Sequence, residues 1–231
     1  MYNILRRRTS GAVCRGIMDN LDPIADLIRR DLDTRDEARE RMLPLCRDAI
    51  RFCSQAIRAI HRQEFDAAGG LLDQARDFIE QADQSVAACL ELGSTGILRD
   101  AQKELAEGHI TLSLVSGHDL PTPDELHVEG PAYLNGLGEA VGEVRRYVLD
   151  SMRHGDLSRC EELLAAMDDI YSILVTMDYP DALTGGLRRT TDMVRGVLER
   201  TRSDLTLAIR QKALEEKLAV FEDRLRNTNR E

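Results

Sequence analysis

The segment PAYLNGLGEAVGEVRRYVLDSMRHGD, residues 131–156, decides the fold. Its apolar residues recur every three or four positions, as on one face of an amphipathic helix, and Pro131 stands where the first turn of a helix tolerates proline. Gly155 ends the pattern and Asp156 can cap a following helix, so a minimal loop is predicted to join two antiparallel neighbours. The apolar stripe consists of Leu134, Leu137, Val141, Val144, Val148 and Met152.

Amphipathic helices are also predicted on both sides of this segment. A capping box from Thr34 to Glu37 indicates a helix start, and Pro44 is expected to kink that helix or to mark its true start. Ser94 and Thr95 can cap another helix. The predicted helices span residues 18–32, 34–61, 64–91, 96–116, 131–153, 157–177 and 182–226, and residues 117–130 form the one irregular connection.

Composition favours an all-α protein of about seven helices. The 231 residues include no Trp and only 4% aromatic residues, and Leu, Ala, Arg and Glu dominate. Residues 1–17 match no periodic pattern and are predicted to be a disordered extension, or the product of an over-called start site. Residues 18–231 are predicted to form a single domain.

The net charge and the cysteine content limit which partners and which cell compartment can be expected. The net charge of −10 repels nucleic acid as a whole, so a polyanion partner needs a locally basic surface. No apolar stretch is long enough for a membrane span or a signal peptide, so a cytoplasmic protein is expected. The odd number of cysteines and the lack of a Cys-x-x-Cys spacing predict reduced core residues: Cys14, Cys46, Cys53, Cys89 and Cys160.

Two pairs of glutamates are the candidate catalytic residues. Glu104 and Glu107 are three positions apart on one predicted helix, and Glu139 and Glu143 are four apart on another. Two such helices packed side by side could pool four carboxylates around one hard cation. Because Glu139 and Glu143 lie roughly opposite the apolar stripe, the alternative is that they are solvated surface charges.

The donor type narrows the chemistry of such a site. The sequence contains no Glu-x-x-His, the motif of di-iron helical bundles, and an all-oxygen donor set favours Mg²⁺ or Mn²⁺. These cations bridge phosphates and activate water, so a metal site here would point to phosphoester hydrolysis. No phosphate-binding loop for nucleotides and no nucleophile elbow is present.

A row of arginines is the candidate nucleic-acid-binding surface. Arg47, Arg51, Arg58 and Arg62 recur at intervals of four, seven and four, which aligns them on one helical face. The row could hold backbone phosphates, form salt bridges to a neighbouring helix, or face water. His61 beside it is expected to make a local hydrogen bond.

Three stretches together resemble the translin family, which comprises translin and translin-associated factor X. Residues 133–156 are similar to the family's signature helix, in which a Gly-Glu-Leu-type core ends in a Ser…Gly-Asp turn. Residues 47–62 resemble its N-terminal helix, and residues 102–107 resemble its central one. The resemblance covers about residues 18–218 in the right order.

The resemblance implies a closed octameric shell of helical subunits that encloses nucleic acid. In such shells the factor X-type subunit is a Mg²⁺-dependent endoribonuclease with four carboxylates facing the interior, and the matching positions here are Glu104, Glu107, Glu139 and Glu143. The catalytic relatives carry Asp at the position of Glu139, so the metal could lie farther from the backbone here. With the complete acidic set in one sequence, a homo-octamer that cuts single-stranded or short structured RNA is expected.

Two other functions stay open at this stage. A shell of this kind could bind single-stranded RNA or DNA without cutting it. The chain could also be a helical scaffold whose glutamates are only surface charge.

Overall fold

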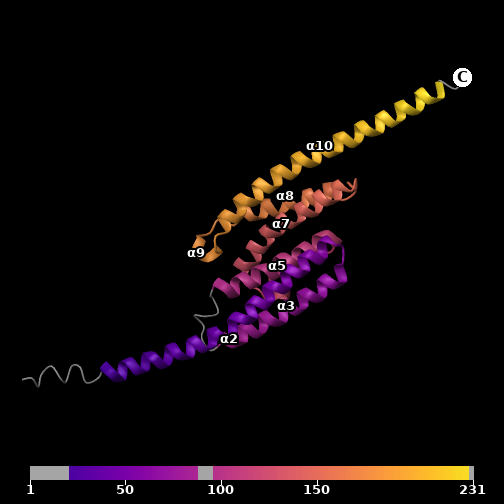
Figure 1. Ribbon diagram of the computed structural model, residues 1–231. Helices are drawn as coiled ribbons and strands as arrows, with labels where there is room; N and C mark the ends of the chain where they lie inside the picture. Colours follow the sequence, from indigo (N-terminus) through magenta and orange to yellow (C-terminus); the bar gives the residue numbers. More distant parts are fainter. Residues whose placement is uncertain (1–20, 88–95, 229–231) are drawn as a thin grey trace, which may run out of the picture.

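The computed structural model describes residues 21–87 and 96–228, and every regular element in these ranges is an α-helix (Figure 1). The all-α prediction is confirmed, although the described residues form eight helices, two of them single turns. The predictions for residues 1–17, for the caps at Ser94 and Thr95, and for a helix end at 91 lie outside the described residues. In chain order the helices are α2 (Leu21–His61), α3 (Phe65–Val86), α5 (Gly96–Ser116), α6 (Pro123–Leu126), α7 (Gly130–Arg153), α8 (Cys160–Thr176), α9 (Asp181–Thr184) and α10 (Leu187–Thr228).

Helix α2 is continuous, so the predicted break between residues 32 and 34 is wrong. The Thr34 hydroxyl donates a hydrogen bond of 2.8 Å to the carbonyl of Arg30, one turn back, and does not cap a new helix. Pro44 lies inside α2 and is not its start. Proline removes one N–H donor, and the helix runs on through it.

Two single-turn helices were not predicted. In α6 the Thr122 hydroxyl accepts a hydrogen bond from the Glu125 amide, and the Glu125 carboxylate accepts one from the Thr122 amide. This capping box lies within the connection that was predicted to be irregular. Gly185 and Gly186 separate α9 from α10 with φ values of +63° and +87°, a left-handed conformation that favours glycine, so the predicted last helix is divided in two.

The connection from α7 to α8 is short, as predicted, but its capping differs. The Asp156 carboxylate accepts a hydrogen bond of 2.9 Å from the Ser158 amide and so holds the turn. Helix α8 begins only at Cys160, after Arg159 as its N-cap residue. Asp156 is therefore a turn residue and not the cap of α8.

The helices form two groups that meet at the contact between α5 and α7 (Figure 1). Helices α2, α3 and α5 pack against one another on one side, and α7, α8 and α10 do so on the other. The first part of α2 and the last part of α10 project from this body at opposite ends. The two acidic helices predicted from the sequence are thus the junction of the fold.

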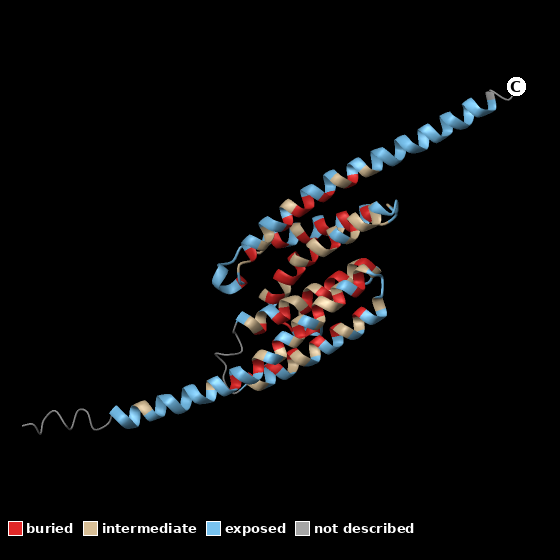
Figure 2. Cartoon of the chain, in the orientation of Figure 1, coloured by how far each residue is buried: buried red, intermediate tan, exposed pale blue. Residues whose placement is uncertain are grey.

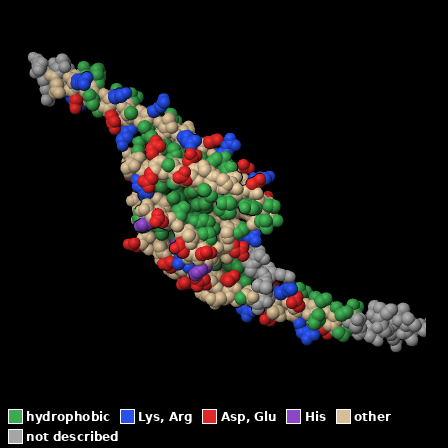
Figure 3. Space-filling view, turned by 180° about the vertical axis from the view of Figure 1, so that it is seen from behind, with side chains coloured by type: hydrophobic (Ala, Val, Ile, Leu, Met, Phe, Trp, Pro, Cys, Tyr) green, Lys and Arg blue, Asp and Glu red, His purple; other side chains and the backbone are tan. Residues whose placement is uncertain are grey.

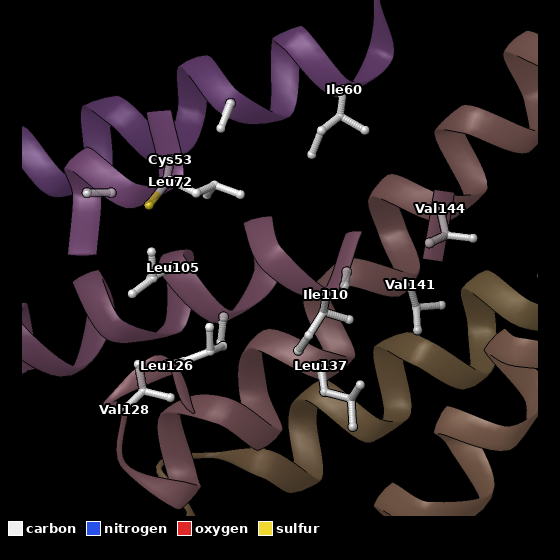
Figure 4. Packing of buried hydrophobic residues seen from close by; sticks show 14 of the residues in the cluster. Cys53, Ile60, Leu72, Leu105, Ile110, Leu126, Val128, Leu137, Val141 and Val144 are labelled. Atoms are coloured by element: carbon white, nitrogen blue, oxygen red, sulfur yellow. The ribbon is translucent and has the colours of Figure 1, made fainter. Parts of the chain in front are cut away.

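The buried residues line the inner faces of both groups and fill the junction (Figure 2). Small residues such as Ala49, Cys53 and Ala56 recur on the buried face of α2, which lets α3 and α5 approach closely. Figure 4 shows Leu105 and Ile110 of α5 in the same core as Leu137 and other α7 residues. The predicted α7 stripe is confirmed: Leu137, Val141, Val144 and Val148 are buried, and Leu134 and Met152 pack against the core.

The described cysteines agree with the prediction that they are reduced residues of the core. Cys46, Cys53 and Cys160 are buried and unbridged, whereas Cys14 and Cys89 lie outside the described residues. None of the described helices is both long enough and apolar enough to span a membrane.

Gly136 permits the close approach of α7 to α5. A Cβ atom added at this position would lie 2.6 Å from the carbonyl oxygen of Lys103 and 2.8 Å from the Cβ of Ala106. The first of these neighbours is backbone and cannot move aside alone. Gly136 therefore sets how near the carboxylates of α7 come to those of α5.

We expect Gly136→Ala to destabilise the protein by about 1 to 3 kcal/mol, or roughly 3 to 10 °C in Tm, because the added methyl group forces the two helices apart. Gly142→Ala is the matched control: it lies on the same helix, and its added Cβ would meet no atom within 4 Å. Helix propensity predicts a small gain of stability for the control. Thermal unfolding followed by circular dichroism makes the comparison, and equal behaviour of the two variants would contradict the close approach.

Candidate metal centre

Three of the four predicted glutamates form one cluster at the junction of α5 and α7. Glu104, Glu107 and Glu139 are all half-buried, and one carboxylate oxygen from each lies within 4.8 Å of the others. Glu104 and Glu107 come from successive turns of α5, and Glu139 comes from α7. Such a convergence of oxygen donors suits a hard divalent cation.

The cluster is electrostatically strained in the absence of a cation. Burial, and then the charges of Glu104, Glu139 and Glu143, together raise the pKa of Glu107 to about 8. Burial also raises the pKa of Glu104, against the opposing effect of Lys103. The Glu107 carboxyl therefore holds a proton at neutral pH, which a divalent cation would replace.

Lys103 is an internal cation of the cluster. Its ammonium nitrogen lies 2.7 and 2.8 Å from the two carboxylate oxygens of Glu139 and 3.8 Å from a Glu104 oxygen. Burial alone would lower the pKa of Lys103, but the hydrogen bond and charge of Glu139 raise it. The sequence shows Lys103 near Glu107, one turn away, and gives no sign of this contact across two helices.

Glu143 lies one turn after Glu139 on α7 and is contacted by His61, the last residue of α2. The His61 ring nitrogen Nε2 lies 2.5 Å from a Glu143 oxygen, and Arg146 lies 3.8 Å from the same oxygen. The hydrogen bond from His61 lowers the pKa of Glu143, so this carboxylate is ionised at neutral pH. Glu143 is close enough to raise the pKa of Glu107, although it is not one of the three converging donors.

His61 is the site residue that sequence reasoning placed wrongly. Its partner is 82 positions away, so the predicted local hydrogen bond is wrong. Only 6% of the His61 side chain is exposed, and within the described part of the chain its Nδ1 atom is buried without a hydrogen-bond partner. No periodic signal could have joined the end of α2 to the middle of α7.

The arginine row lies on the side of α2 away from the cluster. Cys53 lies on the buried face of α2, near enough to the cluster that the charges of Glu104 and Glu107 add to the effect of burial in raising its pKa. At about 100° per residue, the four arginines lie roughly 120° to 180° around the helix from Cys53. Arg47, Arg51, Arg58 and Arg62 are all exposed, with Arg51 paired to Asp48 and Arg62 paired to Glu64.

Other basic residues are nearer to the carboxylates. A cavity of about 480 Å³ adjoins Glu139 and is lined in part by Arg99, Lys103 and Arg189. Arg99 lies 3.9 Å from Glu129, and its Nε atom is buried without a hydrogen bond among the described residues. Asp100 and Glu139 also line this cavity, which adjoins the acidic cluster at Glu139 and is large enough to admit a phosphate group.

Comparisons with known proteins give relatives for the whole body of the chain. No model of a protein family matches the sequence. The uncharacterized protein MJ0175 of Methanocaldococcus jannaschii is 29% identical over 192 residues, which make up 81% of this chain and 83% of that protein. The chain is also similar to the crystal structure of AfC3PO, with 30% identity, a TM-score of 0.75, and coverage of 82% of this chain and 98% of that one.

A second structure, of AfC3PO in complex with duplex RNA, matches with 32% identity, a TM-score of 0.73 and the same coverage. The structure of apo-NeC3PO is 16% identical with a TM-score of 0.66 over 82% of this chain and 97% of that one, which shows a shared fold. Identity of 30% or more across nearly the whole of the AfC3PO chain shows common descent. This chain therefore belongs to the translin family, among the C3PO-type proteins.

Proposed function

We propose that this protein is a metal-dependent endoribonuclease that hydrolyses phosphodiester bonds of single-stranded or short structured RNA. The observation that carries the proposal is the convergence of Glu104, Glu107 and Glu139 within 4.8 Å, at the junction of two helices. Solvated surface glutamates would spread apart, whereas these are half-buried at the cost of raised pKa values for Glu104 and Glu107. The complex of the related AfC3PO with duplex RNA supports RNA as the ligand.

The residues fit Mg²⁺ or Mn²⁺. Glu104, Glu107 and Glu139 offer carboxylate oxygens alone, which hard cations prefer and which softer metals do not. A bound cation of this class would polarise a phosphate group and lower the pKa of water. A cation bound at Glu139 would compete with Lys103, which contacts both oxygens of this carboxylate, and a displaced Lys103 would be free to turn toward substrate.

Glu143 and His61 are suited to proton transfer. Glu143 is ionised at neutral pH because His61 holds it, so it can accept a proton from attacking water. The ring nitrogen Nε2 of His61 contacts a Glu143 oxygen at 2.5 Å and so fixes the orientation of this carboxylate. Glu104, Glu107 and Glu139 would hold the cation, and Glu143, the fourth predicted ligand, would act as the base or complete the coordination from one turn away.

Two basic surfaces would hold RNA phosphates in different places. Arg99 and Arg189 line the cavity beside Glu139 and would bind the phosphates nearest the cleaved bond. The row from Arg47 to Arg62 would bind backbone phosphates on the other side of α2. These two surfaces lie on different sides of one subunit. One RNA molecule would therefore contact both only in an assembly in which different subunits contribute them.

We further propose that eight copies form a closed shell around the RNA. The family relationship supports this assembly, and a lumen explains why carboxylates opposite the α7 stripe read as surface positions in one chain. Light scattering tests it directly, because a shell has a mass several times that of the 26.0 kDa chain. A monomer in solution would contradict the shell.

The proposed activity is tested with labelled RNA. We expect cleavage in Mg²⁺ and none in EDTA, and a loss of at least about 100-fold in rate for Glu143→Ala with RNA binding retained. Glu161→Gln, an exposed carboxylate on α8, is the matched control and should cleave normally. RNA binding without metal-dependent cleavage would favour a non-catalytic binding shell, and absence of both would leave a scaffold.

A further inference from the structure

The two halves of α10 bury different amounts of surface. Up to Leu205 the helix contributes to the core, and its buried residues pack against α7 and α8. Beyond Leu205 no described residue of α10 is buried, and the helix projects from the body (Figure 2). The buried residues of the first half are Leu187, Val194, Val197, Leu198, Thr201 and Leu205.

The projecting half nevertheless carries a regular apolar stripe. The large residues of the stripe are 49% to 64% exposed: Leu207, Leu214, Leu218, Phe221 and Leu225. Ile209 and Val220 are also exposed, but they lie on other sides of the helix. Figure 3 shows hydrophobic side chains between charged ones along this end. Five large apolar side chains in a row on one exposed helix indicate an interaction surface.

This stripe cannot be an extension of the chain's own core. At about 100° per residue, Leu187, Val194 and Leu198 lie within roughly 20° of Leu205 around the helix axis. By the same count the stripe from Leu207 to Leu225 lies about 160° to 220° from Leu205. The apolar face of α10 therefore changes sides where the helix leaves the body.

The spacing of the stripe is that of a coiled coil. Leu207, Leu214, Leu218, Phe221 and Leu225 follow one another at intervals of seven, four, three and four, and Gln211 fills the gap in the first interval. They occupy the d, d, a, d and a positions of consecutive heptads, with Gln211 at an a position. A polar residue at a single a position typically fixes the register of a coil.

The charges beside the stripe identify the partner and its direction. The g positions hold Arg210, Lys217 and Arg224, and the e positions hold Ala208, Glu215 and Glu222. In a parallel pair of identical helices each g residue faces the e residue five positions on in the partner, so opposite charges meet. In an antiparallel pair g faces g and e faces e, so Lys217 would face Lys217 of the other copy.

We propose that residues 207–225 of α10 form a parallel, in-register, two-stranded coiled coil with the same residues of a second copy of this chain. The pair buries the five apolar side chains that the body leaves exposed, and it joins Arg210 to Glu215 and Lys217 to Glu222 across the interface. The contact is separate from the carboxylate centre and does not depend on nuclease activity.

Cysteine crosslinking of the full chain tests the pairing. In a parallel coil equal a positions adjoin, so Gln211→Cys and Leu225→Cys should each form disulfide-linked dimers with themselves. Glu216→Cys, at an outward f position, is the matched control and should give no more dimer than the native chain. Of the five native cysteines, the three that the structure describes, Cys46, Cys53 and Cys160, are buried. Absence of self-crosslinking at both a positions overturns the proposal.

Mixed variants exclude the other arrangements. Crosslinks that form only between Gln211→Cys and Phe221→Cys chains would show an antiparallel pair and overturn the proposed direction. Crosslinks of Gln211→Cys only with Ile24→Cys would show instead that α10 packs on the exposed apolar residues at the start of α2. Either result would overturn the proposed parallel pairing of two α10 helices.

Charge exchange gives a test that is independent of the core positions. In the Gln211→Cys chain, adding Lys217→Glu or Glu222→Lys should lower the dimer yield several-fold, because like charges then meet. Adding both exchanges the two charges, restores opposite pairs and should restore the yield. If the double exchange does not restore the dimer yield, the parallel coil is contradicted. In an antiparallel pair residue 217 still faces residue 217 of the other copy, so like charges would remain after the exchange.

Discussion

Replacing Glu107 by Gln should raise the stability of the metal-free protein at pH 8 and remove both cation binding and RNA cleavage. Burial, followed by repulsion from Glu104, Glu139 and Glu143, raises the pKa of Glu107 from 4.5 to about 8. Ionising this carboxyl in the folded protein therefore costs free energy, on the order of a few kcal/mol. A neutral amide of similar shape avoids that cost and offers the cation a much weaker ligand.

The sign of the pH dependence follows from the same shift. Between pH 4.5 and about 8 the folded state binds more protons at Glu107 than the unfolded state does. Stability from this group is therefore fully present below pH 4.5 and is lost as pH rises to about 8. The metal-free native chain should lose Tm over this range relative to Glu107→Gln, and Mg²⁺ should restore the Tm of the native chain alone.

Thermal unfolding at several pH values, with and without Mg²⁺, measures the effect. Glu161→Gln removes the same type of side chain at an exposed position and should leave both the Tm and its Mg²⁺ dependence unchanged. A Glu107→Gln variant that is less stable than the native chain at pH 8 would show that the carboxylate is not under strain. A variant that retains the Mg²⁺ shift would show that Glu107 is not a ligand.

Most of the fold could be predicted because it depends on periodicity within single helices. The α7 stripe, the helix through Gly69 and Gly70, and the short turn near Gly155 are all local patterns. The errors arise where two local signals compete. Thr34 resembled a cap but bonds back to Arg30, and Gly185 with Gly186 broke a helix whose apolar pattern continued.

The sequence named four glutamates, and the structure brings three of them, Glu104, Glu107 and Glu139, into one cluster. Spacings of three and four residues place each glutamate pair on one face, but contacts between helices leave no such pattern. Lys103 is 36 positions from Glu139, and His61 is 82 positions from Glu143. Lys103 adds a positive charge to the cluster and His61 holds the neighbouring Glu143, and only the packing of α2, α5 and α7 reveals these two contacts.

Lys103→Met should tighten the binding of a divalent cation at least about tenfold, or about 1.4 kcal/mol. The Lys103 ammonium bonds both oxygens of Glu139 and lies 3.8 Å from Glu104, so it repels an incoming cation and occupies one of its ligands. Methionine keeps most of the length and apolar bulk of the side chain but carries no charge. The cation then meets Glu139 without a competitor.

The same change should lower the stability of the metal-free protein. Without the ammonium, Glu104 and Glu139 lose the positive charge that partly neutralises their repulsion, and a buried group deprived of its partner is costly. The variant should therefore gain more Tm on addition of Mn²⁺ than the native chain gains. Lys212→Met on the exposed half of α10 is the control and should change neither quantity.

Electron paramagnetic resonance of free Mn²⁺ measures binding to Lys103→Met without relying on cleavage. Unchanged or weaker Mn²⁺ binding would mean that Lys103 assists the cation, so the carboxylate cluster would need its own ammonium to accept a metal. Tighter binding together with slower cleavage would place Lys103 on the substrate once the cation has displaced it. That outcome is the one we expect, because Lys103 lines the cavity beside Glu139 together with Arg99 and Arg189, and these three cations would bind a phosphate group there.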